Sequence, residues 1–218
     1  MAMPDKMTAR YFSGYGFEAP VIIDVGVLGG TPFLYDSFPN AKFLLIDALE
    51  ESEDAVRETW GDTLDFEFVN AALGATAGRV PIAIEPERPS RTSLSARADL
   101  SEDHFERDVP MLPLDQITDG RNGPFGLKID TEGHELEVLK GATATLERCE
   151  FVIAEVSIKK RFAQGYRFSD VINFMADHGF EVHSFLSGLT RAPRMSDVLF
   201  LPADSPRFDM KTEDEVTR

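Results

Sequence analysis

The chain has 218 residues, with 38 acidic against 22 basic side chains and a formal net charge of -16. This acidity argues against a surface for duplex nucleic acid or a polyphosphate, although a nucleoside ligand needs only local contacts. A single cysteine, Cys149, excludes an intrachain disulfide, and no apolar run reaches the roughly 18 residues of a membrane span. We therefore expect one cytoplasmic domain over residues 1–218, without a secretion signal and without a nucleic-acid or membrane partner.

Short apolar runs alternate with helix-like segments through most of the chain. The runs are VIIDVG from Val21, FLLID from Phe43, FEFVNAAL from Phe66, LKID from Leu127 and FVIAEV from Phe151. They are apolar on both faces, which is typical of strands in a parallel sheet that helices cover on both sides. The helix-like segments span residues 31–38, 50–60, 134–147 and 169–178. This alternation predicts a doubly wound, mostly parallel α/β sheet.

Two segments depart from the alternation. Residues 180–186 and 197–202 predict strands whose connection is too short for a helical crossover, so we expect the last strand to run antiparallel. Residues 78–117 combine a strand-like RVPIAIE with a long polar stretch and predict a small β-rich insertion. The core of the domain is expected over residues 20–203, with a flexible tail at residues 209–218.

Four of the predicted strands end on an acid, namely Asp24, Asp47, Asp130 and Glu155. A turn or a helix cap would explain each acid taken alone. Ligands of open parallel sheets bind beyond the carboxyl ends of the strands, so four acids at that edge predict a ligand crevice.

The turn after the first strand reads DVGVLGGTP, in which Gly26, Gly29 and Gly30 allow the backbone to approach a ligand. The spacing is not the G-x-G-x-x-G of a dinucleotide fingerprint. Asp47 lies 23 positions after Asp24, where an acid accepts hydrogen bonds from ribose hydroxyls and repels a 2′-phosphate. NAD and S-adenosylmethionine both remain, and the acidic crevice favours the positively charged sulfonium of the second.

The most specific motif of the chain is LKIDTEGHELEVLKGA, which starts at Leu127. It resembles the K-I-D-x-E-G-x-E-x-x-V-L-x-G-A block of the FkbM family of S-adenosylmethionine-dependent methyltransferases. DVGVLGG, VNAALGATAGRV, TSLSA, LPLDQI and FVIAEVS also occur in the family's order, and the similarity spans residues 21–202. Two positions differ: Leu28 stands where the family usually has Asn, and Asp47-Ala48 stand where it usually has Glu-Pro.

The resemblance implies a class I methyltransferase (Rossmann-like) fold and O-methylation of a hydroxyl on a sugar, a polyketide or a similar small molecule. S-adenosylmethionine would be the cofactor and S-adenosylhomocysteine the product. The turn at Gly26, Gly29 and Gly30 would face the methionine part, and Asp47 would hold the ribose. The other cofactor candidates are Asp24, Asp130 and, near the adenine, Asn70, Ala71 and Ala72.

Catalysis by such an enzyme depends on positioning and on a base. Alignment of the reacting atoms is expected to contribute about 7–11 kcal/mol and a base about 3–5 kcal/mol. We favour Asp130 as the base and Glu132 as the second choice, while His134 suits proton transfer near neutral pH. Lys128 is expected to balance the carboxylates. Asp130, Glu132 and Glu155, with the imidazole of His134, offer an alternative magnesium or manganese site, for which their spacing is not diagnostic.

The acceptor is expected to be a small molecule that contacts Arg91, Ser93, Glu155 and Tyr166. Two other functions stay open. Leu28 is compatible with a non-catalytic, methyltransferase-like binding or scaffold domain. An NAD-dependent oxidoreductase or epimerase is weakened because the chain has neither G-x-G-x-x-G nor an obvious Tyr-x-x-x-Lys pair. A homo-oligomer is compatible with each of these functions.

Overall fold

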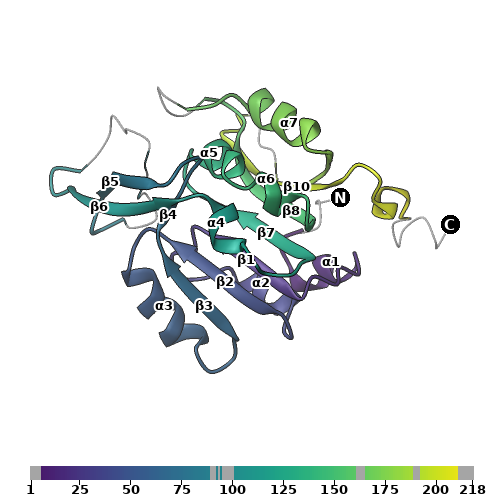
Figure 1. The fold of residues 1–218 in the computed structure, drawn as a ribbon, viewed down its shortest axis with the longest axis horizontal. Helices are drawn as coiled ribbons and strands as arrows, with labels where there is room; N and C mark the ends of the chain where they lie inside the picture. Colours follow the sequence, from purple (N-terminus) through teal and green to yellow (C-terminus); the bar gives the residue numbers. More distant parts are fainter. Residues whose placement is uncertain are drawn as a thin grey trace.

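The computed structural model describes residues 6–88, 92, 94, 101–160, 165–188 and 192–210. Its centre is a seven-stranded sheet with the order β3-β2-β1-β7-β8-β10-β9 (Figure 1). The strands are β1 (Val21–Val25), β2 (Lys42–Asp47), β3 (Phe66–Asn70), β7 (Phe125–Ile129), β8 (Cys149–Ser157), β9 (Phe180–Phe185) and β10 (Met195–Pro202). The pairs from β3 to β8 are parallel, whereas β10 runs antiparallel to β8 and β9. The predicted doubly wound sheet with an antiparallel last strand is confirmed.

Two layers of helices cover this sheet. One face carries α1 (Ala9–Ser13), α2 (Pro32–Ser37) and α3 (Glu51–Trp60), and the other carries α4 (Leu114–Thr118), α5 (Glu135–Lys140), α6 (Thr143–Leu146) and α7 (Phe168–Asp177). Successive side chains of a strand point to opposite faces, so Ile22 packs with the first layer and Ile23 with the second. This double burial explains why the strands are apolar throughout.

A second, three-stranded sheet projects beyond the ends of these strands, at the left of Figure 1. It consists of β4 (Ala72–Leu73), β5 (Gly78–Ile84) and β6 (Phe105–Leu112) in the order β4-β6-β5, as the predicted β-rich insertion requires. The apolar run FEFVNAAL is divided, because Ala71 carries the chain from β3 in the main sheet to β4 in the second. Ile82 of β5 and Val109 of β6 pack with Ala72 of β4 and with Leu49, which follows the end of β2.

The single helix predicted over residues 134–147 is wrong, because the segment forms the two short helices α5 and α6. The chain turns at Gly141, where a Cβ atom would lie 2.1 Å from the backbone oxygen of Gly74. Asp115 then accepts hydrogen bonds from the backbone N–H groups of Ala144 and Thr145 at 3.0 and 2.7 Å. This side chain caps the first turn of α6 and makes a new helix start there.

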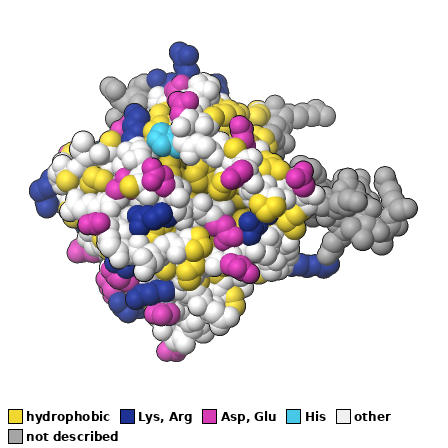
Figure 2. Space-filling model, turned by 45° about the vertical axis from the view of Figure 1, so that its right-hand side comes forward, with side chains coloured by type: hydrophobic (Ala, Val, Ile, Leu, Met, Phe, Trp, Pro, Cys, Tyr) yellow, Lys and Arg dark blue, Asp and Glu magenta, His cyan; other side chains and the backbone are white. Residues whose placement is uncertain are grey.

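The remaining features concern the ends and the surface. The short helix α1 and the 3-10 helix η2 (Pro206–Asp209) were not predicted, and residues 211–218 of the predicted tail lie outside the described residues. In the part of the chain that the structure describes, no helix is long and apolar enough to cross a bilayer. On the face drawn in Figure 2, Asp and Glu are interspersed with Lys and Arg rather than gathered by sign.

Candidate functional site

A cavity of about 290 Å³ opens at the carboxyl ends of β2, β1, β7 and β8. Most residues predicted to bind the cofactor or to act in catalysis line it: Gly26, Gly29, Gly30, Asp47, Ala71, Ala72, Lys128, Asp130 and Glu132. Glu155, expected to contact the acceptor, lines it as well. Ile82 of β5 and the residues Thr92 and Leu94, between β5 and β6, add apolar and hydroxyl groups. The cavity therefore has carboxylates along the sheet edge and an apolar wall on the side of the insertion.

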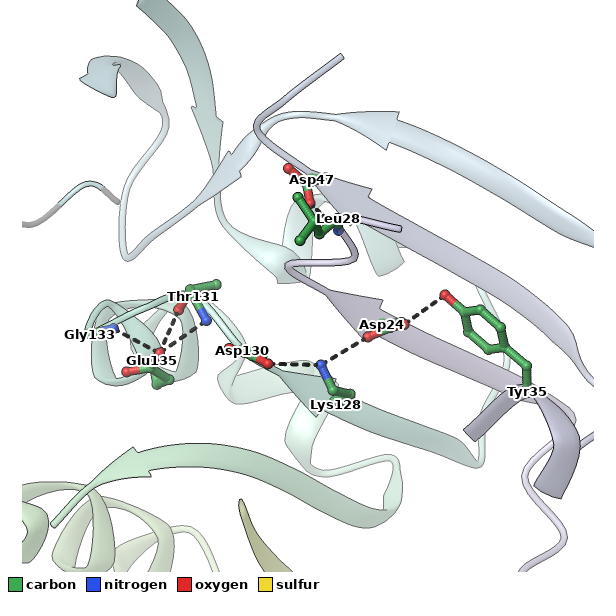
Figure 3. Close-up of polar contacts among 9 residues, drawn as sticks. All are labelled: Asp24, Leu28, Tyr35, Asp47, Lys128, Asp130, Thr131, Gly133 and Glu135. Atoms are coloured by element: carbon green, nitrogen blue, oxygen red, sulfur yellow. Dashed lines mark hydrogen bonds and ion pairs between the residues drawn. The ribbon is translucent and has the colours of Figure 1, made fainter. Parts of the chain in front are cut away.

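Asp47 is held by backbone donors on both of its carboxylate oxygens. The N–H of Leu28 donates to Oδ2 at 2.8 Å (Figure 3). The N–H of Leu49 donates to Oδ1, also at 2.8 Å. Burial raises the pKa of this carboxyl group, and the two backbone hydrogen bonds oppose the rise. A carboxylate accepts about four hydrogen bonds, so Asp47 retains capacity for two hydroxyl groups of a ligand.

Leu28 has a φ of 51°, in the left-handed region that leucine rarely adopts. Its backbone N–H supplies the hydrogen bond to Asp47, and its side chain packs against the apolar cluster of the insertion. The family's usual Asn is a residue that tolerates this backbone conformation more easily. The position thus contributes to the site through its backbone.

Gly26 allows the ends of β1 and β7 to touch. Its φ is 78°, and a Cβ atom there would lie 1.7 Å from the backbone oxygen of Asp130. Asp130 in turn donates its N–H to the backbone oxygen of Val25 at 2.9 Å. By contrast, a Cβ atom on Gly29 would meet nothing within 4 Å, because Gly29 faces open space at the cavity.

Lys128 is a buried cation between two carboxylates. Its Nζ lies 3.6 Å from Asp24 Oδ1 and 3.5 Å from Asp130 Oδ2, and the Tyr35 hydroxyl donates to Asp24 Oδ2 at 2.9 Å (Figure 3). Burial opposes the charge of Lys128, yet Asp24, Asp130 and Asp197 raise its pKa to about 12. Lys128 therefore stays an ammonium group. Asp24 is fully buried beneath the cavity and does not line it, so its role is to fix Lys128.

Glu155 lies at the same edge, on β8, between β7 and β10. Asp130 follows β7, and Asp197 on β10 is the direct partner of Glu155 in the antiparallel pair. Burial, followed by the charges of Asp130, Glu132 and Asp197, raises the pKa of Glu155 to about 8. Glu155, two residues before the end of β8, is therefore largely protonated at neutral pH.

The loop between β7 and α5 is fixed by Glu135, a fully buried side chain that the sequence did not identify as part of the site. Its Oε1 accepts the N–H groups of Thr131 and Gly133 at 3.0 and 2.9 Å (Figure 3). Its Oε2 accepts the hydroxyl of Tyr166. Glu132, between the two backbone donors, has a φ of 51° and lines the cavity. Glu135 thus holds Glu132 in a backbone conformation that is otherwise unfavourable.

Besides Asp24, three predicted residues lie outside the cavity lining. Tyr166, expected to contact the acceptor, is buried, and its hydroxyl also accepts the N–H of Ser157 at 3.2 Å. His134 precedes α5; burial lowers its pKa, and its Nε2 has no hydrogen-bond partner. Asn70 donates its amide N–H to the backbone oxygen of Asp47 at 3.0 Å. The contacts of Tyr166 and Asn70 stabilise the protein around the cavity.

Two predictions remain to be compared with the structure: the acceptor contacts of Arg91 and Ser93, and the alternative metal site. Arg91 and Ser93, expected to contact the acceptor, lie outside the described residues. Within the described residues, no group of three or more His, Cys, Asp or Glu side chains is placed to hold a metal ion. The alternative metal site of Asp130, Glu132 and Glu155 is therefore not assembled.

Comparisons with known proteins agree with this geometry. The family model described as methyltransferase FkbM domain matches residues 65–182, more than half of the 218 residues. Cofactor-bound Rv0187 from MTB is 11% identical, with 94% of this chain and 83% of that chain covered and a TM-score of 0.55. Magnesium protoporphyrin IX methyltransferase from Synechocystis PCC 6803 with bound SAM is 12% identical over 88% and 75% of the two chains, with a TM-score of 0.52. These two likenesses show the fold, which is that of class I methyltransferases. No curated protein matches the sequence.

Proposed function

Because the chain belongs to the FkbM family of S-adenosylmethionine-dependent methyltransferases, we propose that it methylates a hydroxyl group of a small molecule. The observation that carries the proposal is the cavity at the carboxyl ends of β2, β1, β7 and β8, with Asp47 at one end and Glu155 at the other. A nucleoside and an acceptor could lie there side by side along the sheet edge.

The residues present fit S-adenosylmethionine. Asp47 has acceptor capacity for the two ribose hydroxyls, and the apolar side chains of Leu49 and Ala72 border the same end of the cavity. The turn at Gly26 to Gly30 would hold the methionine part, next to Asp130. When bound, this cofactor supplies a methyl group on a positively charged sulfur. A carboxylate-lined cavity favours that charge over a neutral or anionic ligand.

The chain's own residues would align the acceptor and receive its proton. Lys128 holds Asp130 by an ion pair, and Glu135 holds the loop that carries Glu132. The acceptor end is therefore built on β7, β8 and a loop tied to the protein interior, which keeps the acceptor oxygen in a fixed position. Alignment of reacting groups lowers the activation free energy by about 7–11 kcal/mol in well-oriented intramolecular reactions. This is more than a catalytic base contributes.

Calorimetric titration with S-adenosylhomocysteine and with NAD tests the cofactor. We expect micromolar binding of the first ligand only, and a loss of about 10–100-fold in Asp47→Asn, because one ribose hydrogen bond to a charged acceptor is worth about 1.5–3 kcal/mol. Asp54→Asn, on the exposed surface of α3, is the matched control and should bind like the parent. Binding of NAD alone, or equal binding by Asp47→Asn, would contradict the proposal.

The hydroxyl acceptor is tested with a cofactor that carries a 13C-labelled methyl group. The protein is incubated with matched panels of hydroxylated sugars and polyketide-like alcohols, and the products are examined by NMR. We expect a labelled O-methyl signal in at least one product. Labelled methyl groups found only on nitrogen or carbon would refute O-methylation while leaving the cofactor assignment intact.

A further inference from the structure

The order of the strands arranges the cavity along one line. Asp47 at the end of β2 comes first, then the glycine turn after β1, then Asp130 after β7, and finally Glu155 on β8. If the ribose binds at Asp47 and the methionine part at the glycine turn, as the proposed function requires, the transferred methyl group points towards β7 and β8. The side chain of Glu155 then borders the acceptor.

The residues expected to act as a base are otherwise engaged or lie elsewhere. Asp130 is held in an ion pair with the Lys128 ammonium, 3.5 Å away. His134 does not line the cavity. Glu132 lines it as well, from the loop that Glu135 fixes, whereas Glu155 projects from β8, a strand in the interior of the sheet. Among the carboxylates of the cavity, Glu155 combines a rigid position with a place at the acceptor end.

We propose that Glu155 is the catalytic base of the methyl transfer, and that it becomes a carboxylate when the positively charged cofactor binds beside it. This inference rests on the proposed function. In the transfer, the acceptor oxygen gives its proton to Glu155 and forms a bond to the methyl carbon, while the sulfur keeps the electron pair of its broken bond. One positive charge and one negative charge disappear together, so the products leave a neutral Glu155 beside a neutral thioether.

The charges around Glu155 explain why binding of a positively charged cofactor would change its protonation. Burial acts first, and carboxylates then face Glu155 from four directions: Asp130 after β7, Glu132 in the loop, Asp197 on β10 and Glu135 on α5. The cation of this region, Lys128, forms ion pairs with Asp24 and Asp130. Together these surroundings raise the pKa of Glu155 to about 8. A sulfonium placed beside Glu155 acts in the opposite direction and favours the ionised form.

Proton release on ligand binding tests the inference without an identified acceptor. S-adenosylmethionine and S-adenosylhomocysteine are titrated at pH 7 in buffers of different ionisation enthalpy, so that calorimetry counts the protons released. With a pKa of about 8, Glu155 holds about 0.9 proton at pH 7. We expect release approaching that amount with the charged ligand, little release with the neutral one, and a difference that fades by about pH 9.

Three variants assign the proton. The amino group of the cofactor also titrates in this range, so the signal of Glu155 is the part that Glu155→Gln removes. Glutamine resembles the protonated acid, so this variant should fold. Asp197→Asn removes a neighbouring charge and should lower the pKa of Glu155, which reduces the release at pH 7. Glu137→Gln, on the outer side of α5 and paired with Lys140, is the control and should behave like the parent.

The outcomes separate the inference from the function on which it rests. Failure of both ligands to bind refutes the proposed function and the inference with it. If both bind but release equal numbers of protons, or if Glu132→Gln rather than Glu155→Gln removes the difference, the assignment of Glu155 is wrong and the cofactor assignment stands. If the difference in proton release between the two ligands disappears in Glu155→Gln and becomes smaller in Asp197→Asn, the assignment of Glu155 as the base is supported.

Discussion

Replacement of Tyr166 by phenylalanine is expected to destabilise the folded protein by about 2–4 kcal/mol. The hydroxyl donates to the buried carboxylate of Glu135 and accepts the backbone N–H of Ser157 at 3.2 Å. The variant keeps the ring but leaves Glu135 Oε2 and the backbone N–H of Ser157 buried without this hydrogen-bond partner. Each unsatisfied buried group costs about 1–3 kcal/mol, and Glu135 keeps its other donors, so we take the lower part of the range for the two groups together. A loss of about 2–4 kcal/mol lowers the melting temperature of a chain of this size by about 4–16 °C.

Urea denaturation measures this loss, with Tyr15→Phe as the matched control. The hydroxyl of Tyr15 donates to the hydroxyl of Tyr11 at 2.9 Å in a half-buried position, so its removal should cost only about 0.5–1.5 kcal/mol. If Tyr166→Phe loses no more stability than this control, the buried contacts of Glu135 contribute nothing specific and the reasoning fails.

The pH dependence of the same variant gives a second check. Burial raises the pKa of Glu135, and its hydrogen-bond donors, Tyr166 first among them, oppose the rise. Without the tyrosine hydroxyl the pKa of Glu135 in the folded state rises further, so the folded variant binds a proton more tightly than the folded parent. The stability difference between the two proteins should therefore shrink as the pH falls through the pKa of Glu135 in the variant. A difference that grows towards low pH would refute this account.

Three further outcomes are expected. Gly26→Ala should fail to give folded protein because its Cβ would overlap a backbone oxygen at 1.7 Å, whereas Gly29→Ala should melt like the parent. Lys128→Met should lower the unfolding free energy by about 3–5 kcal/mol, because it leaves Asp24 charged, buried and without its cation, and a second change, Asp24→Asn, should restore part of that loss in denaturant melts. Burial raises the pKa of Cys149 to about 12, so a thiol reagent at pH 8 should modify it only after unfolding, and rapid modification of the native protein would contradict its burial.

Much of the fold could be predicted because its signals are local. Apolar runs buried on both faces predict strands, and the short connection before the last strand predicts its direction. The break at Gly141 could not be predicted in this way, because it depends on Gly74 and Asp115, which approach it from distant parts of the chain. The period of the apolar residues continues across the break and favours one helix.

The candidate site also combines residues that local sequence signals predict with residues whose roles depend on distant parts of the chain. Asp47 and the glycine turn could be predicted, because their places at the strand ends follow from the alternation of elements. The roles of Glu135 and Tyr166 could not, because 31 positions separate them and neither position is part of a periodic pattern. The repeated acid in TEGHE was a usable signal for Glu135, since a second carboxylate two residues after Gly133 can accept the backbone donors of that loop.

The pairing of β1 with β7 has a consequence for the order of events during synthesis. Val21 lies opposite Phe125, so this contact closes a loop of roughly a hundred residues, at an entropic cost of about 4 kcal/mol. The strands β1, β2 and β3 can associate as soon as they leave the ribosome, which assembles the end of the cavity that contains Asp47. The end that contains Asp130 and Glu155 must wait until β7 and β8 have emerged. A nascent chain stalled before β7 would therefore present half of the cavity to water.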